Sequence, residues 1–142
     1  MEMNIDVYTY IYTKLKQSLK ENLADYGIEV TKLSKQETDR FPLVVFTEED
    51  NVLSTRTLNR EETFSDLYYE VNIYTRDKII NGEECFAIDI ARLISAEVDK
   101  VLNKTYHMDR LFCRPTPNLD NSIYRITMRY SVGLNDNRVK FK

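Results

Sequence analysis

Few residues in this sequence have types and spacings that could support catalysis or metal binding. His107 is the single histidine, and Cys85 and Cys113 lie too far apart to form a CxxC pair. A histidine without other ligands at the usual spacing does not predict a zinc site. The acidic run 48–50 (EED) could attract a cation, but neighbouring carboxylates in a loop or strand are usually solvated. We therefore expect no metal and no cofactor.

Motifs that bind phosphate or activate a nucleophile are also missing from the sequence. The chain has only three glycines, and they are scattered, so it contains no P-loop, no GxSxG turn and no dinucleotide-binding turn. Spacing suggests no pair of nucleophile and base. The sequence is thus interpreted as that of a protein that is not an enzyme, and its function is sought in its surfaces.

Length and charge narrow the class of protein further. The chain has 142 residues, which predicts a single domain over 1–142. Its net charge is −3, and basic residues are interspersed with acidic ones, whereas proteins that bind nucleic acid usually show a basic excess or stripe. Specific nucleic-acid recognition is therefore not expected, although passive contact with DNA inside a pore stays open.

The N-terminus and the cysteines indicate the compartment. The first residues, MEMNIDVYTYIY, lack the basic region and apolar run of a signal peptide, and no apolar stretch approaches the roughly 18 residues of a membrane span. We expect a protein that is made and kept, or assembled, in the cytoplasm. No membrane partner is expected, and both cysteines should be free, buried thiols.

The strongest secondary-structure signal is the alternation in residues 64–76, FSDLYYEVNIYTR, which predicts a strand. One face would carry Leu67, Tyr69, Val71, Ile73 and Thr75, and the other Tyr68, Glu70, Asn72, Tyr74 and Arg76. The first face is expected in the core. The second face would meet water or another subunit.

Two amphipathic helices are expected to cover the core face. Residues 4–25 carry a stripe at helical spacing, formed by Tyr8, Ile11, Tyr12, Leu15, Leu19 and Leu23. This stripe fits either a core or a partner-binding face, and Gly27 follows where a helix commonly stops. Residues 84–104 show the better helical pattern, and Glu83 and Glu84 suit its first turn, where acidic side chains are favoured.

The remaining elements complete one sheet. Strands are expected at 28–33, 41–47, 108–115 and 122–134, and 77–83 is expected to form a turn around Asn81-Gly82. The order is then α-β-β-β-α-β-β. This order predicts an α+β fold with a single mixed, largely antiparallel sheet and both helices packed on one face.

Two parts of the chain are left available for contacts. The first is the outer sheet face, which fits an assembly surface and also fits a merely solvated face. The second is a long arm or loop at about 48–63, which contains extended strand ends and also fits a plain flexible hairpin tip. The candidate assembly residues are Arg56, Arg60, Tyr68, Tyr74, Arg125 and Arg129. The tail at about 135–142 is polar and expected to be loose.

Three segments, in this order, carry a resemblance to a known family. They are FPLVVFTEEDN, DLYYEVNIYTRDK and LFCRPTPNLDNSIYRITMRYSV, which together extend over roughly residues 40–134. The proline-turn-strand pattern PTPNLDNSIYRITMRY is the most distinctive. With a helix between the second and third segments, the chain resembles small neck and tail-completion proteins of tailed bacteriophages, above all those of Gram-positive hosts, their prophages and phage-tail-like particles.

The resemblance implies a structural protein of the virion. Members of this family serve as tail terminators, or head–tail joining proteins, with a mixed sheet flanked by helices. Typically six copies form a ring that caps the tail tube and provides the surface on which the head connector docks. The implied partners are further copies of this chain, the tail tube protein and the connector or neck proteins, and DNA would only pass through the lumen. The family has no catalytic residues to transfer.

Two other functions stay open. One is a head-side stopper or adaptor in the same neck, and the other is a small cytoplasmic binding module with an unrelated ligand. A ring subunit needs different surfaces for its two neighbours, and the sheet face and the arm are the candidates.

Overall fold

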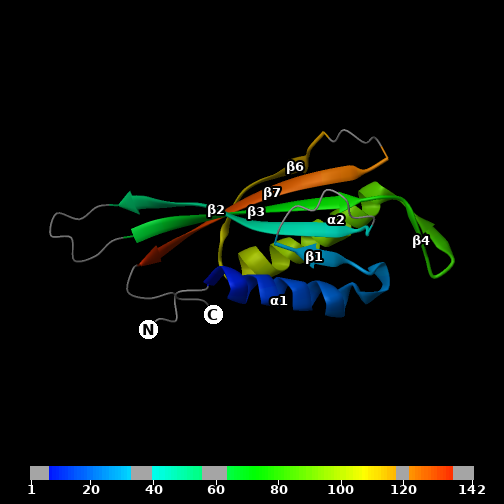
Figure 1. Cartoon of the computed structure of the whole chain (residues 1–142), viewed down its shortest axis with the longest axis horizontal. Helices are drawn as coiled ribbons and strands as arrows, with labels where there is room; N and C mark the ends of the chain where they lie inside the picture. The colour runs from blue at the N-terminus through cyan, green and yellow to red at the C-terminus, as the bar shows by residue number, and fades with distance from the viewer. Residues whose placement is uncertain (1–6, 33–39, 56–63, 118–121, 136–142) are drawn as a thin grey trace.

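The computed structural model describes residues 7–32, 40–55, 64–117 and 122–135. Their elements are α1 (Val7–Asn22), η2 (Ala24–Tyr26), β1 (Glu29–Thr31), β2 (Leu43–Thr55), β3 (Phe64–Thr75), β4 (Lys78–Ile80), β5 (Glu83–Cys85), α2 (Ala87–Asp99), η3 (Lys100–Thr105), β6 (Asp109–Pro115) and β7 (Tyr124–Asn135). The predicted α+β class is confirmed, and Figure 1 shows the helices beside one layer of long strands.

The main sheet has five strands in the order β1-β2-β3-β7-β6. All neighbours are antiparallel except β1 and β2, which run parallel. Strand β3 lies in the middle and pairs along nearly its whole length with β2 on one edge and β7 on the other. The sheet is therefore mixed and largely antiparallel, as predicted.

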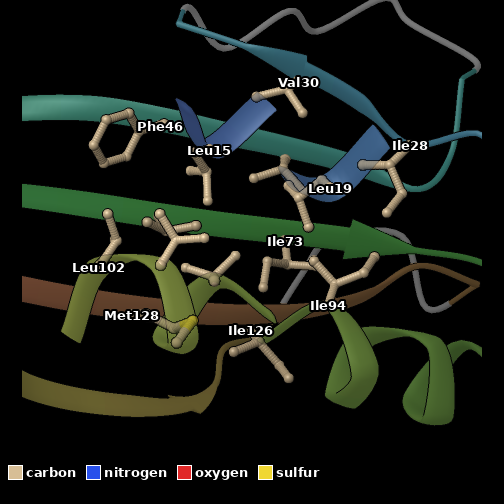
Figure 2. Close-up of a cluster of buried hydrophobic side chains, with 14 of the residues drawn as sticks. Leu15, Leu19, Ile28, Val30, Phe46, Ile73, Ile94, Leu102, Ile126 and Met128 are labelled. Carbon is tan, nitrogen blue, oxygen red and sulfur yellow. The ribbon is translucent and has the colours of Figure 1, made fainter. Parts of the chain in front are cut away.

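The core lies on one face of this sheet, where the alternate residues of β2, β3 and β7 meet both helices. From the sheet these residues include Val44, Phe46, Tyr69, Val71, Ile73, Ile126, Met128 and Tyr130, and from the helices Ile11, Leu15, Leu19, Ile90, Ile94 and Val98. Figure 2 shows Leu15 and Leu19 of α1 and Ile94 of α2 directed toward Phe46 and Ile73. Both helices thus pack on the same face of the sheet, as the alternation in β3 required.

Helix α1 follows the predicted stripe. Ile11, Leu15 and Leu19 are fully buried, while Tyr8 and Tyr12 are partly buried against the core, so the stripe is a core face. The helix ends at Asn22, and Gly27 follows the short turn η2 with a φ of 61°, which suits a residue without a Cβ atom. Residues 4–6 of the predicted helix lie outside the described residues.

The second helix was predicted to begin too early. Residues Glu83–Cys85 form β5, which pairs antiparallel with β4, and α2 begins only at Ala87. The two-residue turn Asn81-Gly82 has φ values of 53° and 82°, the conformation that joins antiparallel strands most tightly. Because this turn closes a hairpin, the acidic pair belongs to a strand and not to a helical first turn. After α2, the chain continues into η3, one segment of wider π-helical turns.

Strand β2 extends further than the sequence analysis placed it. Residues up to Thr55 pair with β3, with irregularities between Glu48 and Asn51 and between Leu53 and Thr55. The first half of the expected arm at 48–63 is therefore a strand end, and 56–63 lie outside the described residues. The expected loose tail begins at Asn135, the last residue of β7, and 136–142 also lie outside them.

Both cysteines are free, as expected, but they are half-buried and not fully buried. In the part of the chain that the structure describes, no helix has the length and apolar character needed to cross a membrane.

Ile94→Asp should unfold the protein. Ile94 is fully buried, and an ionised carboxylate buried without a partner costs several kcal/mol, against a typical total stability of about 5–15 kcal/mol. The matched control is Leu93→Asp one position earlier on the same helix, where the side chain is 46% exposed. Thermal unfolding followed by circular dichroism should show a large loss of stability for Ile94→Asp and little change in stability for Leu93→Asp. Equal losses would contradict the helix orientation.

Stability should fall at alkaline pH. Burial, with smaller contributions from Glu48 and Tyr12, raises the pKa of Tyr8 to about 12, whereas an unfolded tyrosine has a pKa of about 10. The folded state holds this proton more tightly, so its contribution to stability is complete below about pH 10 and is lost as the pH rises toward 12. The urea concentration at the midpoint of unfolding should fall as the pH rises through this window, and it should fall less in Tyr8→Phe than in the wild type. If the midpoint of Tyr8→Phe falls with pH as steeply as that of the wild type, Tyr8 is not a source of the pH dependence.

Candidate functional site

The sheet face opposite the helices brings together four of the six candidate residues. Tyr68 and Tyr74 come from β3, Arg125 and Arg129 from β7, and all four side chains are half-buried. Tyr74 lies directly opposite Arg125 in the antiparallel register. Tyr68 lies opposite Ser131, two residues from Arg129, so that pair is diagonal. Arg56 and Arg60 lie outside the described residues, and the structure does not place them.

Each of these arginines is stacked on a tyrosine. The guanidinium carbon of Arg125 lies 5.2 Å from the ring centre of Tyr74, and that of Arg129 lies 5.2 Å from the ring centre of Tyr68. Both distances are within the range of an attractive cation–π contact. These contacts restrict the two guanidinium groups, which reduces the conformational entropy that a partner would have to remove.

Two further pairs of the same kind extend this surface. Arg114 stacks on Phe112 at 4.3 Å in β6, and Arg76, directly after β3, stacks on Phe41 at 4.6 Å. Phe112 and Arg114 pair with Arg129 and Thr127 in β7, so they belong to the same face. We call the surface formed by the four arginines Arg76, Arg114, Arg125 and Arg129 with their aromatic partners the arginine–aromatic face.

The candidate residues predicted from the sequence did not include Phe112, Arg114 or Phe41, and they did not include Arg76, although alternation already placed Arg76 on this face. The available signal was alternation, because residues an even number of positions apart in a strand share a face. Phe112 and Arg114 meet this criterion, as do Tyr74 and Arg76. The register between β6 and β7 was still needed to show that Arg114 lies beside Thr127, and this register shifts between Arg110 and Phe112.

A buried polar cluster lies at the centre of the arginine–aromatic face. The Asn72 side-chain oxygen accepts hydrogen bonds from Arg125 Nε at 3.1 Å, Arg125 Nη2 at 2.9 Å and Thr127 Oγ1 at 2.7 Å. The Asn72 amide nitrogen donates to Glu70 Oε2 at 3.0 Å. Thr116 adds a hydroxyl bond of 2.6 Å to Thr127. Asn72 is only 8% exposed, so this cluster positions Arg125 rigidly from below.

Arg129 is held differently. Its Nε atom is buried and has no hydrogen-bond acceptor, so one donor of a charged group is unsatisfied. A buried donor without a partner is costly, and such cases call for an explanation. Because the Nε atom is buried, an acceptor from another molecule does not reach it.

An open cleft lies at one end of the sheet, beside the hairpin β4–β5. Its volume is about 650 Å³, and it is lined by Arg76, Asp77, Phe86, Ala87, Ile88, Ser122, Ile123 and Tyr124. Phe86 and Ile88 are both exposed, as is Ile79 in β4. Exposed apolar side chains gathered in this way are typical of protein contact sites.

The described residues offer little for catalysis. They contain no group of three or more His, Cys, Asp or Glu side chains that could hold a metal ion. His107 is exposed and has a φ of 60°, in the bend between η3 and β6. Burial raises the pKa of the Cys113 thiol, which disfavours the nucleophilic thiolate.

No family model and no curated protein sequence matches this chain.

Asn72→Leu should destabilise the protein through the polar cluster. The substitution removes the acceptor of Arg125 and Thr127, and unsatisfied buried donors cost about 1–3 kcal/mol. The matched control is Arg114→Met on the same face, which loses only an exposed cation–π contact of about 0.5–1 kcal/mol. Urea denaturation should separate the two variants clearly. A loss in Asn72→Leu no larger than in the control would mean that water replaces the missing acceptor.

Proposed function

We propose that this protein is a structural component of a tailed bacteriophage or phage-tail-like particle. In this proposal it acts as a tail terminator, or tail-completion subunit. Copies of the chain form a ring that caps the tail tube, stops its growth and joins it to the head connector. The observation that carries the proposal is the arginine–aromatic face, a half-buried surface of stacked side chains on the sheet face that neither α1 nor α2 covers.

The segments that carry the family resemblance support this proposal through their position. FPLVVFTEEDN lies largely in β2, DLYYEVNIYTRDK largely in β3, and LFCRPTPNLDNSIYRITMRYSV extends over β6 and β7. These four strands are consecutive neighbours in the sheet, in the order β2-β3-β7-β6. Segments distant in sequence thus form one continuous structural unit, and this unit contains the arginine–aromatic face.

The composition of the arginine–aromatic face also supports an assembly role. Tyr and Arg are enriched in protein interfaces and among the residues that contribute most to binding. Two tyrosines and four arginines are concentrated here, in a chain that is acidic as a whole. Arg125 is in addition held by the buried polar cluster around Asn72, so this part of the surface is preorganised for contact.

The acidic balance of the chain fits a ring around DNA. A net charge of −3 on each copy gives no general attraction for the phosphate backbone, so DNA could pass through without being retained. This is consistent with DNA as a transient neighbour and not as a ligand.

The proposal is tested by deleting the gene from its phage or prophage and examining the particles by electron microscopy. Without a terminator, tail polymerisation is not capped, so we expect overlong or headless tails, and a plasmid copy of the wild-type gene should restore normal particles. Full heads that leak DNA beside tails of normal length would instead indicate a head-side stopper. If wild-type particles do not contain the protein and particles made after the deletion have normal form, the assignment to the virion is wrong.

A further inference from the structure

The hairpin β4–β5 extends away from the end of the sheet, as seen at the right of Figure 1. Its strands have three residues each and are joined by the tight turn Asn81-Gly82. Ile79 in β4 is 72% exposed, the highest exposure among the large apolar side chains that the structure describes. The hairpin is anchored on its inner side, where Ile80 joins the core and Lys78 bonds to two backbone oxygens, so Ile79 is presented on the outer side, where a contact would bury it.

The surroundings of Ile79 are apolar at the centre and acidic at the edge. Phe86 is 52% exposed and follows β5 directly. Exposed acidic side chains lie along the same end of the molecule: Asp77, Glu83, Glu84 and Asp89. Of the basic residues here, Arg76 directly precedes Asp77 and lines the same cleft, and Lys78 is directed inward, because its Nζ donates to the backbone oxygens of Tyr26 at 2.8 Å and Phe41 at 3.2 Å. We call this surface the acidic hairpin end.

The arginine–aromatic face has the opposite character. Among the side chains that the structure describes, Glu70 and Asp109 are acidic residues that share the outer face of β3, β7 and β6 with the arginines, and Glu70 lies directly opposite Arg129. Glu70 is already engaged with Asn72. Arg129 is half-buried, and Arg114 is exposed. The face therefore presents stacked arginine–aromatic pairs with an exposed guanidinium group at Arg114, which complement an apolar centre with an acidic edge.

We infer that the acidic hairpin end of one copy docks on the arginine–aromatic face of the next copy. Glu84, which lies opposite Ile79 and shares its hairpin face, pairs with the exposed Arg114, while Glu83 adds negative charge at the rim. Ile79 packs against the stacked arginine–aromatic pairs. The two patches have different elements and different charges, so the contact is heterologous and propagates from copy to copy until it closes into a ring. This inference rests on the proposed ring and identifies the two surfaces that build it.

A second copy fits the arginine–aromatic face better than nucleic acid does. Proteins that bind single strands offer free aromatic faces on which bases stack. Here the rings of Tyr68, Tyr74 and Phe112 already carry stacked arginines from the same chain. A carboxylate needs only the outward donors of these guanidinium groups, which stacking leaves accessible.

Charge exchange provides the experiment. One variant carries Glu83→Arg and Glu84→Arg on the hairpin, a second carries Arg114→Glu and Arg129→Glu on the sheet, and a third combines all four changes. Sedimentation velocity over a concentration series measures self-association, and circular dichroism checks folding. If Arg129→Glu fails to fold, Arg114→Glu alone takes its place.

Each two-site variant should associate at least tenfold more weakly than the wild type, since like charges then face each other. The four-site variant should recover most of the association, because the two charges are exchanged together. An equimolar mixture of the two-site variants should also associate, since the hairpin of each then complements the sheet of the other. If the hairpin variant associates as the wild type does while the sheet variant does not, the two sheet faces pair with each other and the inference is wrong.

A photo-crosslinking amino acid at Ile79 separates this inference from the proposed function. In purified particles and in concentrated protein, we expect the crosslink on β3, β6 or β7 of a second copy. A crosslink from Ile79 only to a different virion protein would overturn the docking inference and leave the virion role intact. If the protein forms the expected crosslink in solution but is never found in particles, the contact is supported and the tail role is contradicted. A wild type that stays monomeric both free and in particles would overturn both.

Discussion

The pairing of β3 on both of its edges is the constraint on which the rest of this structure depends. A slip of one residue against β2 or β7 would move Val71 and Ile73 out of the core and bring Asn72 and Tyr74 into it. Two independent interactions oppose such a slip. Apolar burial under α1 and α2 holds one face, and the hydrogen bonds from Arg125 and Thr127 to Asn72 hold the other. The same register therefore builds the core and the outer surface.

The outer surface follows from this register as directly as the core does. Antiparallel pairing places Arg125 beside Tyr74, and the diagonal neighbour places Arg129 over Tyr68. Arginine in such a position is held by its ring and, for Arg125, by Asn72. The result is a positive surface on an acidic chain, while the exposed negative charge at the hairpin end lies on β5 and its neighbours. This separation of charge within one molecule is what makes head-to-tail association physically reasonable.

Much of this fold could be predicted because its signals are local. The alternation in β3 identified both of its faces, and the spacing of Ile11, Leu15 and Leu19 identified the buried side of α1. The start of α2 could not be predicted in the same way, because Glu83–Cys85 suit a helical first turn and a hairpin strand equally well. The partner strand Lys78–Ile80 and the cap that Asp77 Oδ1 provides to Ala87 N decided between them.

The sequence by itself determined the class of fold and the buried face of each long element, because periodicity and composition act over short distances along the chain. Only the tertiary structure decided that β1 runs parallel to β2, that Phe112 and Arg114 join Arg129 on one face, and that Asn72 is the acceptor at the centre of that face. These features depend on which strands pair and in which register. That choice is made by packing between segments up to about fifty residues apart in sequence, such as Asn72 and Arg125, for which no local pattern exists.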